Sequence, residues 1–144
     1  MQVAGSGTGA AASGVAIVEV YEADSAPGQL VNLSCRAQVG TGANVLIAGF
    51  AVSGAQSRRV LVRAVGPTLA GFGLAANTLL ADPQLEVFDG KGASLAKNDN
   101  WGGTAALKTA FTSVGAFALA DTSKDAAVVL TLPPGSYTAQ VSGV

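Results

Sequence analysis

The residues best suited to chemistry in this chain are oxygen donors in the stretch Leu85–Trp101. The donors are Asp89, Asn98, Asp99 and Asn100. Carboxylate and amide oxygens are the ligands that Ca²⁺ prefers, so these four side chains form a candidate calcium site. Their spacing differs from that of an EF-hand, which places oxygens at alternate positions around a glycine and ends in a glutamate.

A structural role for the same residues remains open, and we favour it. Asp89-Gly90 is a typical hairpin turn, and Asn98–Asn100 can bond to nearby backbone groups in a polar corner. Asp121 or Asp125 could complete a calcium site if a neighbouring loop brought one of them close.

Two further side chains have alternative roles. Trp101 could form a sugar-stacking platform with Tyr21 or Tyr137, or it could cover the edge of a core. Arg63 shares a strand face with apolar residues, which indicates a partly buried cation in an ion pair. Asp82 or Glu86 is the expected partner.

Several kinds of catalysis are excluded by residue types that the chain lacks. There is no histidine, which removes Ser-His-Asp catalysis and histidine metal sites. The single cysteine, Cys35, cannot form an internal disulfide, and we expect it to be a buried structural thiol. We therefore expect a protein that is not an enzyme and has no cofactor other than the candidate Ca²⁺.

The composition favours one small β domain. The chain has 144 residues, of which 49% are hydrophobic and 12% charged, with a net charge of −1. The only adjacent basic pair is Arg58-Arg59, so we expect no nucleic-acid partner. No apolar run is long enough for a membrane span.

The pattern of apolar residues and turns predicts an all-β fold, a jelly-roll-like β-sandwich of about eight strands with one short helix. Val45–Val52 is almost wholly apolar, which predicts a central strand buried on both faces and joined by a hairpin to Arg58–Val65. Thr104–Val114 is the expected helix, capped by Thr104 and ended by Gly115. The other main strands are expected at 15–22, 30–39, 126–132 and 136–142, and Leu85–Trp101 is expected to form a strand, an Asp-Gly turn, a second short strand and a polar corner.

The two ends of the chain suggest association. Residues 1–14 are rich in Gly and Ala, and we expect an arm or inter-repeat linker there, followed by the domain at 15–144. The arm has neither the basic nor the apolar segment of a signal peptide. Gln2-Val3-Ala4-Gly5-Ser6 is similar to the final residues, Gln140-Val141-Ser142-Gly143-Val144.

The strand at 15–22 is a suitable partner for the strand at 136–142, either within one chain or between two chains. Pairing between chains would give head-to-tail assembly by strand addition. The residues expected to carry this assembly are Val15, Ile17, Val18, Val20, Tyr137 and Val141.

Two stretches resemble the bacterial pre-peptidase C-terminal-like (PPC-like) family. They are Leu-Glu-Val-Phe-Asp-Gly-Lys-Gly-Ala-Ser-Leu-Ala-Lys-Asn-Asp from Leu85 and Leu-Thr-Leu-Pro-Pro-Gly-Ser-Tyr-Thr-Ala-Gln-Val from Leu130. The region Leu30–Leu74 is similar to repeat units of large secreted or surface proteins of bacteria. These resemblances imply an extracellular or cell-surface jelly-roll module that accompanies other domains and is not a catalyst.

The sequence therefore predicts a non-catalytic extracellular structural module that associates through its terminal strands, as a tandem repeat or a filament subunit. The alternative is a carbohydrate-binding or Ca²⁺-stabilised accessory domain of a secreted enzyme, with a polysaccharide as the partner.

Overall fold

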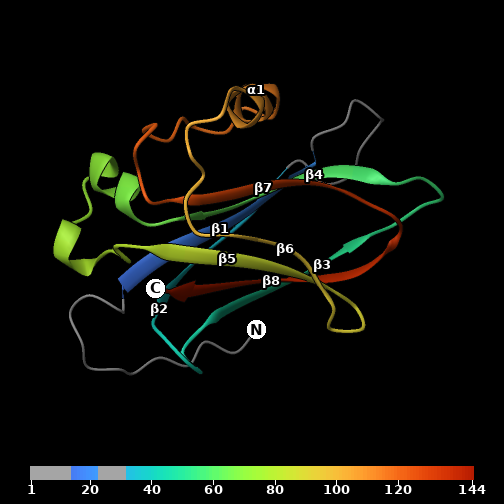
Figure 1. Cartoon of the computed structure of the whole chain (residues 1–144), viewed down its shortest axis with the longest axis horizontal. Helices are drawn as coiled ribbons and strands as arrows, with labels where there is room; N and C mark the ends of the chain where they lie inside the picture. The colour runs from blue at the N-terminus through green and yellow to red at the C-terminus, as the bar shows by residue number, and fades with distance from the viewer. Residues whose placement is uncertain (1–13, 23–31) are drawn as a thin grey trace.

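The computed structural model of the protein describes residues 14–22 and 32–144 (Figure 1). Within these residues it contains eight strands, two short 3-10 helices and one α-helix. Their order is β1 (Gly14–Glu22), β2 (Asn32–Val39), β3 (Leu46–Val52), β4 (Arg58–Val65), η1 (Pro67–Phe72), η2 (Ala76–Thr78), β5 (Pro83–Asp89), β6 (Ser94–Asn98), α1 (Ala105–Ser113), β7 (Ala126–Leu132) and β8 (Gly135–Gly143).

The strands form two antiparallel four-stranded sheets. The first sheet has the order β2-β1-β4-β7 and the second has the order β3-β8-β5-β6. The predicted all-β sandwich is therefore confirmed. The described part of the chain contains no helix with the length and apolar character needed to cross a membrane.

The inner core fills the space between the two sheets. In β4 it uses alternate residues, Val60, Val62 and Ala64, as the period-two geometry of a strand requires. The second sheet contributes inward residues such as Val87 and Val141 from β5 and β8. Alternation thus assigns one face of each sheet to this core.

A second apolar cluster covers the outer face of the first sheet. We call it the outer cluster; its buried members are Leu61, Val65, Leu69, Leu79, Trp101, Phe111, Leu119 and Ala127. They come from β4 and β7 of this sheet, from η1 and α1, and from the loops around them; Figure 1 shows α1 above β7. Strand β4 is consequently buried on both faces from Val60 to Val65.

The predicted helix is confirmed as α1. The Thr104 hydroxyl accepts a bond from the Leu107 N–H at 3.4 Å, which caps the first turn. Gly115 follows the helix with φ +69°, a left-handed conformation that favours glycine. Ala110 and Phe111 are the buried residues of the helix, and Phe111 belongs to the outer cluster.

Two predictions about β3 are wrong. It lies at an edge of the second sheet, where Ile47 is 55% exposed, and it is not a central strand buried on both faces. It pairs with β8, whereas β4 pairs with β1 and β7, so the loop between β3 and β4 joins different sheets and makes no hairpin. The uniformly apolar composition of β3 hid its one-sided burial.

The predicted pairing of the first and last strands does not occur within the chain. Strand β1 lies between β2 and β4, and β8 lies between β3 and β5 in the other sheet. Sequence complementarity between two strands does not specify which sheet each one joins.

Both ends of the described domain lie at one pole of the sandwich. Gly14 is paired with Val39 at the start of β1. The N–H of Gly143, at the end of β8, donates to the carbonyl of Gly40 at 2.9 Å, and Gly40 directly follows Val39. Strand β1 already includes Gly14, one residue before the predicted domain boundary, and the remainder of the predicted arm lies outside the described residues.

Candidate functional site

Asp89 organises the turn between β5 and β6. Its Oδ1 accepts the N–H groups of Lys91 at 2.8 Å and Ala93 at 2.9 Å. These two bonds favour the charged form of the Asp89 carboxyl and therefore hold its pKa below the usual 3.8. The bond from Ala93 lowers the pKa more than the bond from Lys91 does. The carboxylate therefore has a local structural function in the hairpin turn.

Asn98 occupies the other end of β6. Its Oδ1 accepts the N–H of Ala127 at 3.0 Å, and its Nδ2 donates to the carbonyl of Asn100 at 2.9 Å. The first bond links the edge strand β6 of one sheet to the edge strand β7 of the other. The side chain thus closes the sandwich at this corner.

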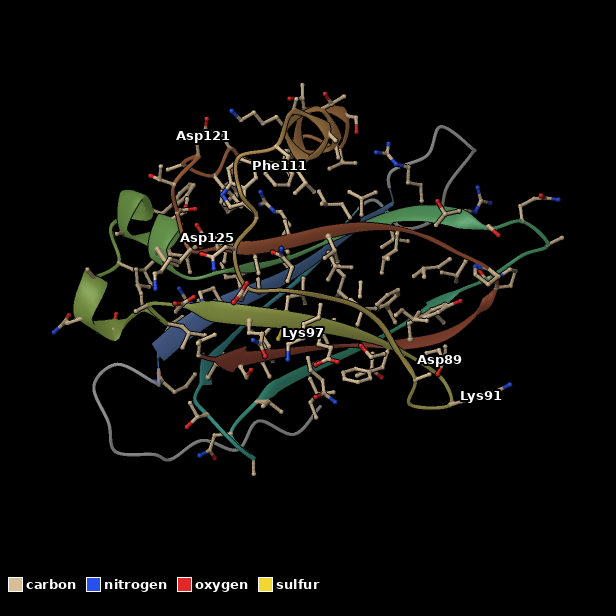
Figure 2. All side chains as sticks on the ribbon, viewed as in Figure 1. Asp89, Lys91, Lys97, Phe111, Asp121 and Asp125 are labelled. Carbon is tan, nitrogen blue, oxygen red and sulfur yellow. The ribbon has the colours of Figure 1, made fainter. Side chains whose placement is uncertain are left out.

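The structure separates Asp89 from Asn98, Asp99 and Asn100. Asn98 is paired with Leu85, which precedes Asp89 by four residues in β5, a separation of about 13 Å along an extended strand. Figure 2 shows Asp121 and Asp125 at the opposite end of the molecule from Asp89. One calcium ion cannot contact both groups, and the described residues contain no cluster of three or more acidic or cysteine side chains suited to a metal.

Trp101 is buried, with 2% of its surface exposed. Its ring lies 5.3 Å from that of Phe111, and its Nε1 donates to the Ala120 carbonyl at 3.0 Å and to the Ser123 hydroxyl at 3.1 Å. A sugar platform of Trp101 with Tyr137 is therefore wrong, because Tyr137 belongs to the inner core on the other side of the first sheet. The side chain of Tyr21 lies outside the described residues.

Arg63 is fully buried at the centre of the outer face of the first sheet. Its Nη1 donates to the Phe117 carbonyl at 2.6 Å, and its guanidinium carbon lies 4.2 Å from the Phe117 ring centre and 5.0 Å from that of Phe111. The expected partners are engaged elsewhere, because Asp82 contacts Lys124 and Glu86 lies 3.7 Å from Lys97. Two aromatic faces and a carbonyl are among the groups that stabilise the buried cation.

Asp125 is a second buried charge, and it joins three segments. Its Oδ1 accepts the N–H of Gly66 at 2.8 Å, and its Oδ2 accepts the Thr68 hydroxyl. Its backbone carbonyl accepts the N–H of Trp101 at 2.9 Å. Asp125 therefore ties the start of η1 and the Trp101 corner to the beginning of β7. Sequence reasoning identified only a candidate calcium ligand here, since the contacts are distant along the chain.

Two hollows adjoin these elements. A pocket of about 250 Å³ lies beneath α1, with Trp101 and Phe111 in its wall and the Lys108–Asp121 ion pair (2.6 Å) beside it. A groove of about 350 Å³ follows β7 and is lined by Arg59, Ala96, Ala106, Leu107 and residues 127–130. Apart from Arg59, the side chains that line the groove are apolar, which makes it a candidate contact surface.

The residues expected to mediate assembly lie in strands with both neighbours in place. Val15 and Ile17 of β1 are partly buried against the outer cluster, and Tyr137 and Val141 of β8 are buried in the inner core. The side chains of Val18 and Val20 lie outside the described residues. The backbone of β1 and β8 is therefore not available for strand addition in this conformation.

The comparison with known proteins identifies no relative. No protein-family model matches the chain, and neither a curated protein nor a solved structure shows significant similarity to it.

Proposed function

We propose that this protein is a non-catalytic structural module that acts by associating with neighbouring copies or repeats. The observation that carries the proposal is that the first residue of β1, Gly14, and the last residue of β8, Gly143, lie at the same pole next to the Val39-Gly40 turn. A module joined to its neighbours at one pole keeps the sides of its sheets free for contacts.

The functions of the polar residues support a structural module. Asp89 orders a turn, Asn98 joins two strands, and Asp125 fastens η1 to β7. Each of these side chains bonds to backbone groups of its own chain. Asp125 also accepts the hydroxyl of Thr68, and this bond belongs to the same link between η1 and β7.

The extracellular setting is part of the same proposal and rests on the PPC-like resemblance. The two stretches that carry this resemblance lie on β5–β6 and on β7–β8. Strands β5 and β8 are neighbours in the second sheet, paired from Pro83–Gly143 to Asp89–Tyr137. The resemblance therefore covers one contiguous part of the fold.

Sedimentation velocity on the full chain, over a wide concentration series, tests the proposal. We expect the mean sedimentation coefficient to rise with concentration, because association follows mass action. A second sample, two copies joined in series through their own terminal residues, should unfold at a higher temperature than a single copy. A single copy that stays monomeric, together with a joined pair that unfolds like the single copy, would contradict the proposed function.

A further inference from the structure

The four edge strands of the sandwich differ in how well they are protected. Edge strands expose unpaired N–H and C=O groups, and proteins usually block them with charges, prolines or bulges. Strand β2 carries Arg36, and β6 carries Lys97 and adjoins a register shift at Val87/Phe88. Strands β3 and β7 contain no charged residue and no proline, and each has seven residues.

The free backbone groups of β7 can be assigned from one hydrogen bond. The N–H of Ala127 donates to Asn98 in β6, so it points away from β4. Because successive residues of a strand alternate in direction, the N–H groups of Val129 and Thr131 point the same way. No described strand lies beyond them, and the apolar groove of about 350 Å³ runs beside this part of β7.

Strand β3 presents the complementary edge. Its outward face carries three exposed residues, Ile47, Gly49 and Ala51, and Ile47 is 55% exposed. Strand β3 adjoins β2 through the 40–45 connection, whereas β7 adjoins β6 through the Asn98 bond. The two uncharged edges therefore lie on opposite flanks of the sandwich.

We propose that β7 of one copy pairs with β3 of a second copy, so that the first sheet of one molecule continues into the second sheet of the next. This inference rests on the proposed function, and it names the partner and the surfaces. The outward N–H of Ala127 is already bonded to Asn98, so the pairing uses the part of β7 that includes Val129 and Thr131, and the seven residues of β3 are long enough to cover it. Pairing of unlike edges occupies both unprotected strands, whereas a β7–β7 dimer would leave β3 open. Because the two edges lie on opposite flanks, the contact is heterologous and produces an open filament.

Two edge variants of the full chain test this pairing. Thr131→Pro removes an outward N–H of β7 and leaves the bonds to β4 intact, with Thr131→Ala as its control. Ile47→Lys combined with Ala51→Lys places two charges on the exposed face of β3. Its control is Gln140→Lys with Ser136→Lys, which adds the same charges directly opposite, on the interior strand β8. Circular dichroism selects folded variants, and Thr131→Lys replaces Thr131→Pro if the proline variant fails to fold.

Mass photometry and sedimentation velocity provide the measurements. We expect the wild type and both controls to form chains of increasing length, and each edge variant alone to be monomeric. An equimolar mixture of the β3 and β7 variants should form a 1:1 dimer and nothing larger, since each retains the edge that the other lacks. Dimers of the β3 variant alone would indicate β7–β7 pairing and overturn the inference. If both edge variants associated as the wild type does, the β7–β3 pairing would be overturned, but the proposed function, association of copies, would stand. A monomeric wild type would also overturn the β7–β3 pairing.

Discussion

Replacing Asp125 with alanine tests whether a single buried carboxylate holds the outer layer of the first sheet in place. The carboxylate accepts the buried N–H of Gly66 at 2.8 Å and the hydroxyl of half-buried Thr68. Alanine removes both acceptors, but it preserves the backbone bond from Trp101 to residue 125. The variant therefore isolates the side chain's contribution.

The expected destabilisation follows chiefly from these two donors, because the third donor, the N–H of Thr68, lies 3.5 Å from Oδ1 and contributes little. A buried donor without a partner costs about 1–3 kcal/mol, and the Thr68 hydroxyl, which can turn toward water, costs less. The sum is about 3 kcal/mol. At about 2–4 °C per kcal/mol for a domain of this size, the melting temperature should fall by about 6–12 °C.

Urea denaturation of the wild type, Asp125→Ala, Thr68→Val and the double variant measures this loss and the coupling between the two residues. We expect a coupling free energy of about 1–2 kcal/mol, because their hydrogen bond involves a charged acceptor. Asp121→Ala is the control, since its exposed pair with Lys108 should contribute less than about 1 kcal/mol. If Asp125→Ala destabilised the protein no more than this control, the structural function assigned to Asp125 would be refuted.

Three further predictions concern the remaining candidate residues. Trp101→Ala should lower the free energy of unfolding by about 3–5 kcal/mol in urea denaturation, because it opens a cavity beside Phe111; a loss below about 1 kcal/mol would contradict its place in the outer cluster. The pKa of Asp89 is lower in the folded protein than its usual value of 3.8. Its charged form therefore contributes stability that is present above pH 3.8 and is lost as the pH falls through the folded-state pKa. In thermal melts, the wild type should accordingly have a higher melting temperature than Asp89→Asn at neutral pH, and this difference should disappear in acid. A difference that persisted in acid would show that the stabilisation does not depend on the charge of Asp89. Added Ca²⁺ should leave the melting temperature unchanged, because Asp89 and Asn98 lie too far apart for one ion; a clear rise would be evidence for a bound ion.

Local sequence patterns predicted the local elements well. Asp89-Gly90 between two short strands indicated the β5–β6 hairpin, and Thr104 with Gly115 bounded α1. Each of these signals depends on neighbouring residues, through turn chemistry or capping bonds. Alternation in Arg58–Val65 likewise separated the residues of the inner core from those of the outer cluster.

Longer-range features could not be predicted in the same way. The sequence indicated a partly buried Arg63 in an ion pair, but Phe111 and Phe117, whose rings lie beside its guanidinium, follow about 50 residues later and carry no pattern that marks them as partners. The oxygen donors of the candidate calcium site lie apart for a related reason. The calcium hypothesis assumed that oxygen donors close together in the sequence can contact one ion. An extended strand, however, moves successive residues apart by about 3.3 Å each.

By itself, the sequence determined the class of the fold, most of its strands and the helix, because hydrophobic period and turn residues act over a few positions. Tertiary structure alone decided which strands share a sheet. That choice placed β1 and β8 in interior positions and left β3 and β7 as the uncharged edges. Strand pairing depends on contacts between distant segments that compete for the same partners, and the apolar patterns of β1, β3 and β8 satisfy several pairings equally. The oxygen donors of Leu85–Trp101 were visible from the beginning, but only the folded chain showed that Asp89 orders a turn and Asn98 fastens a corner of the sandwich.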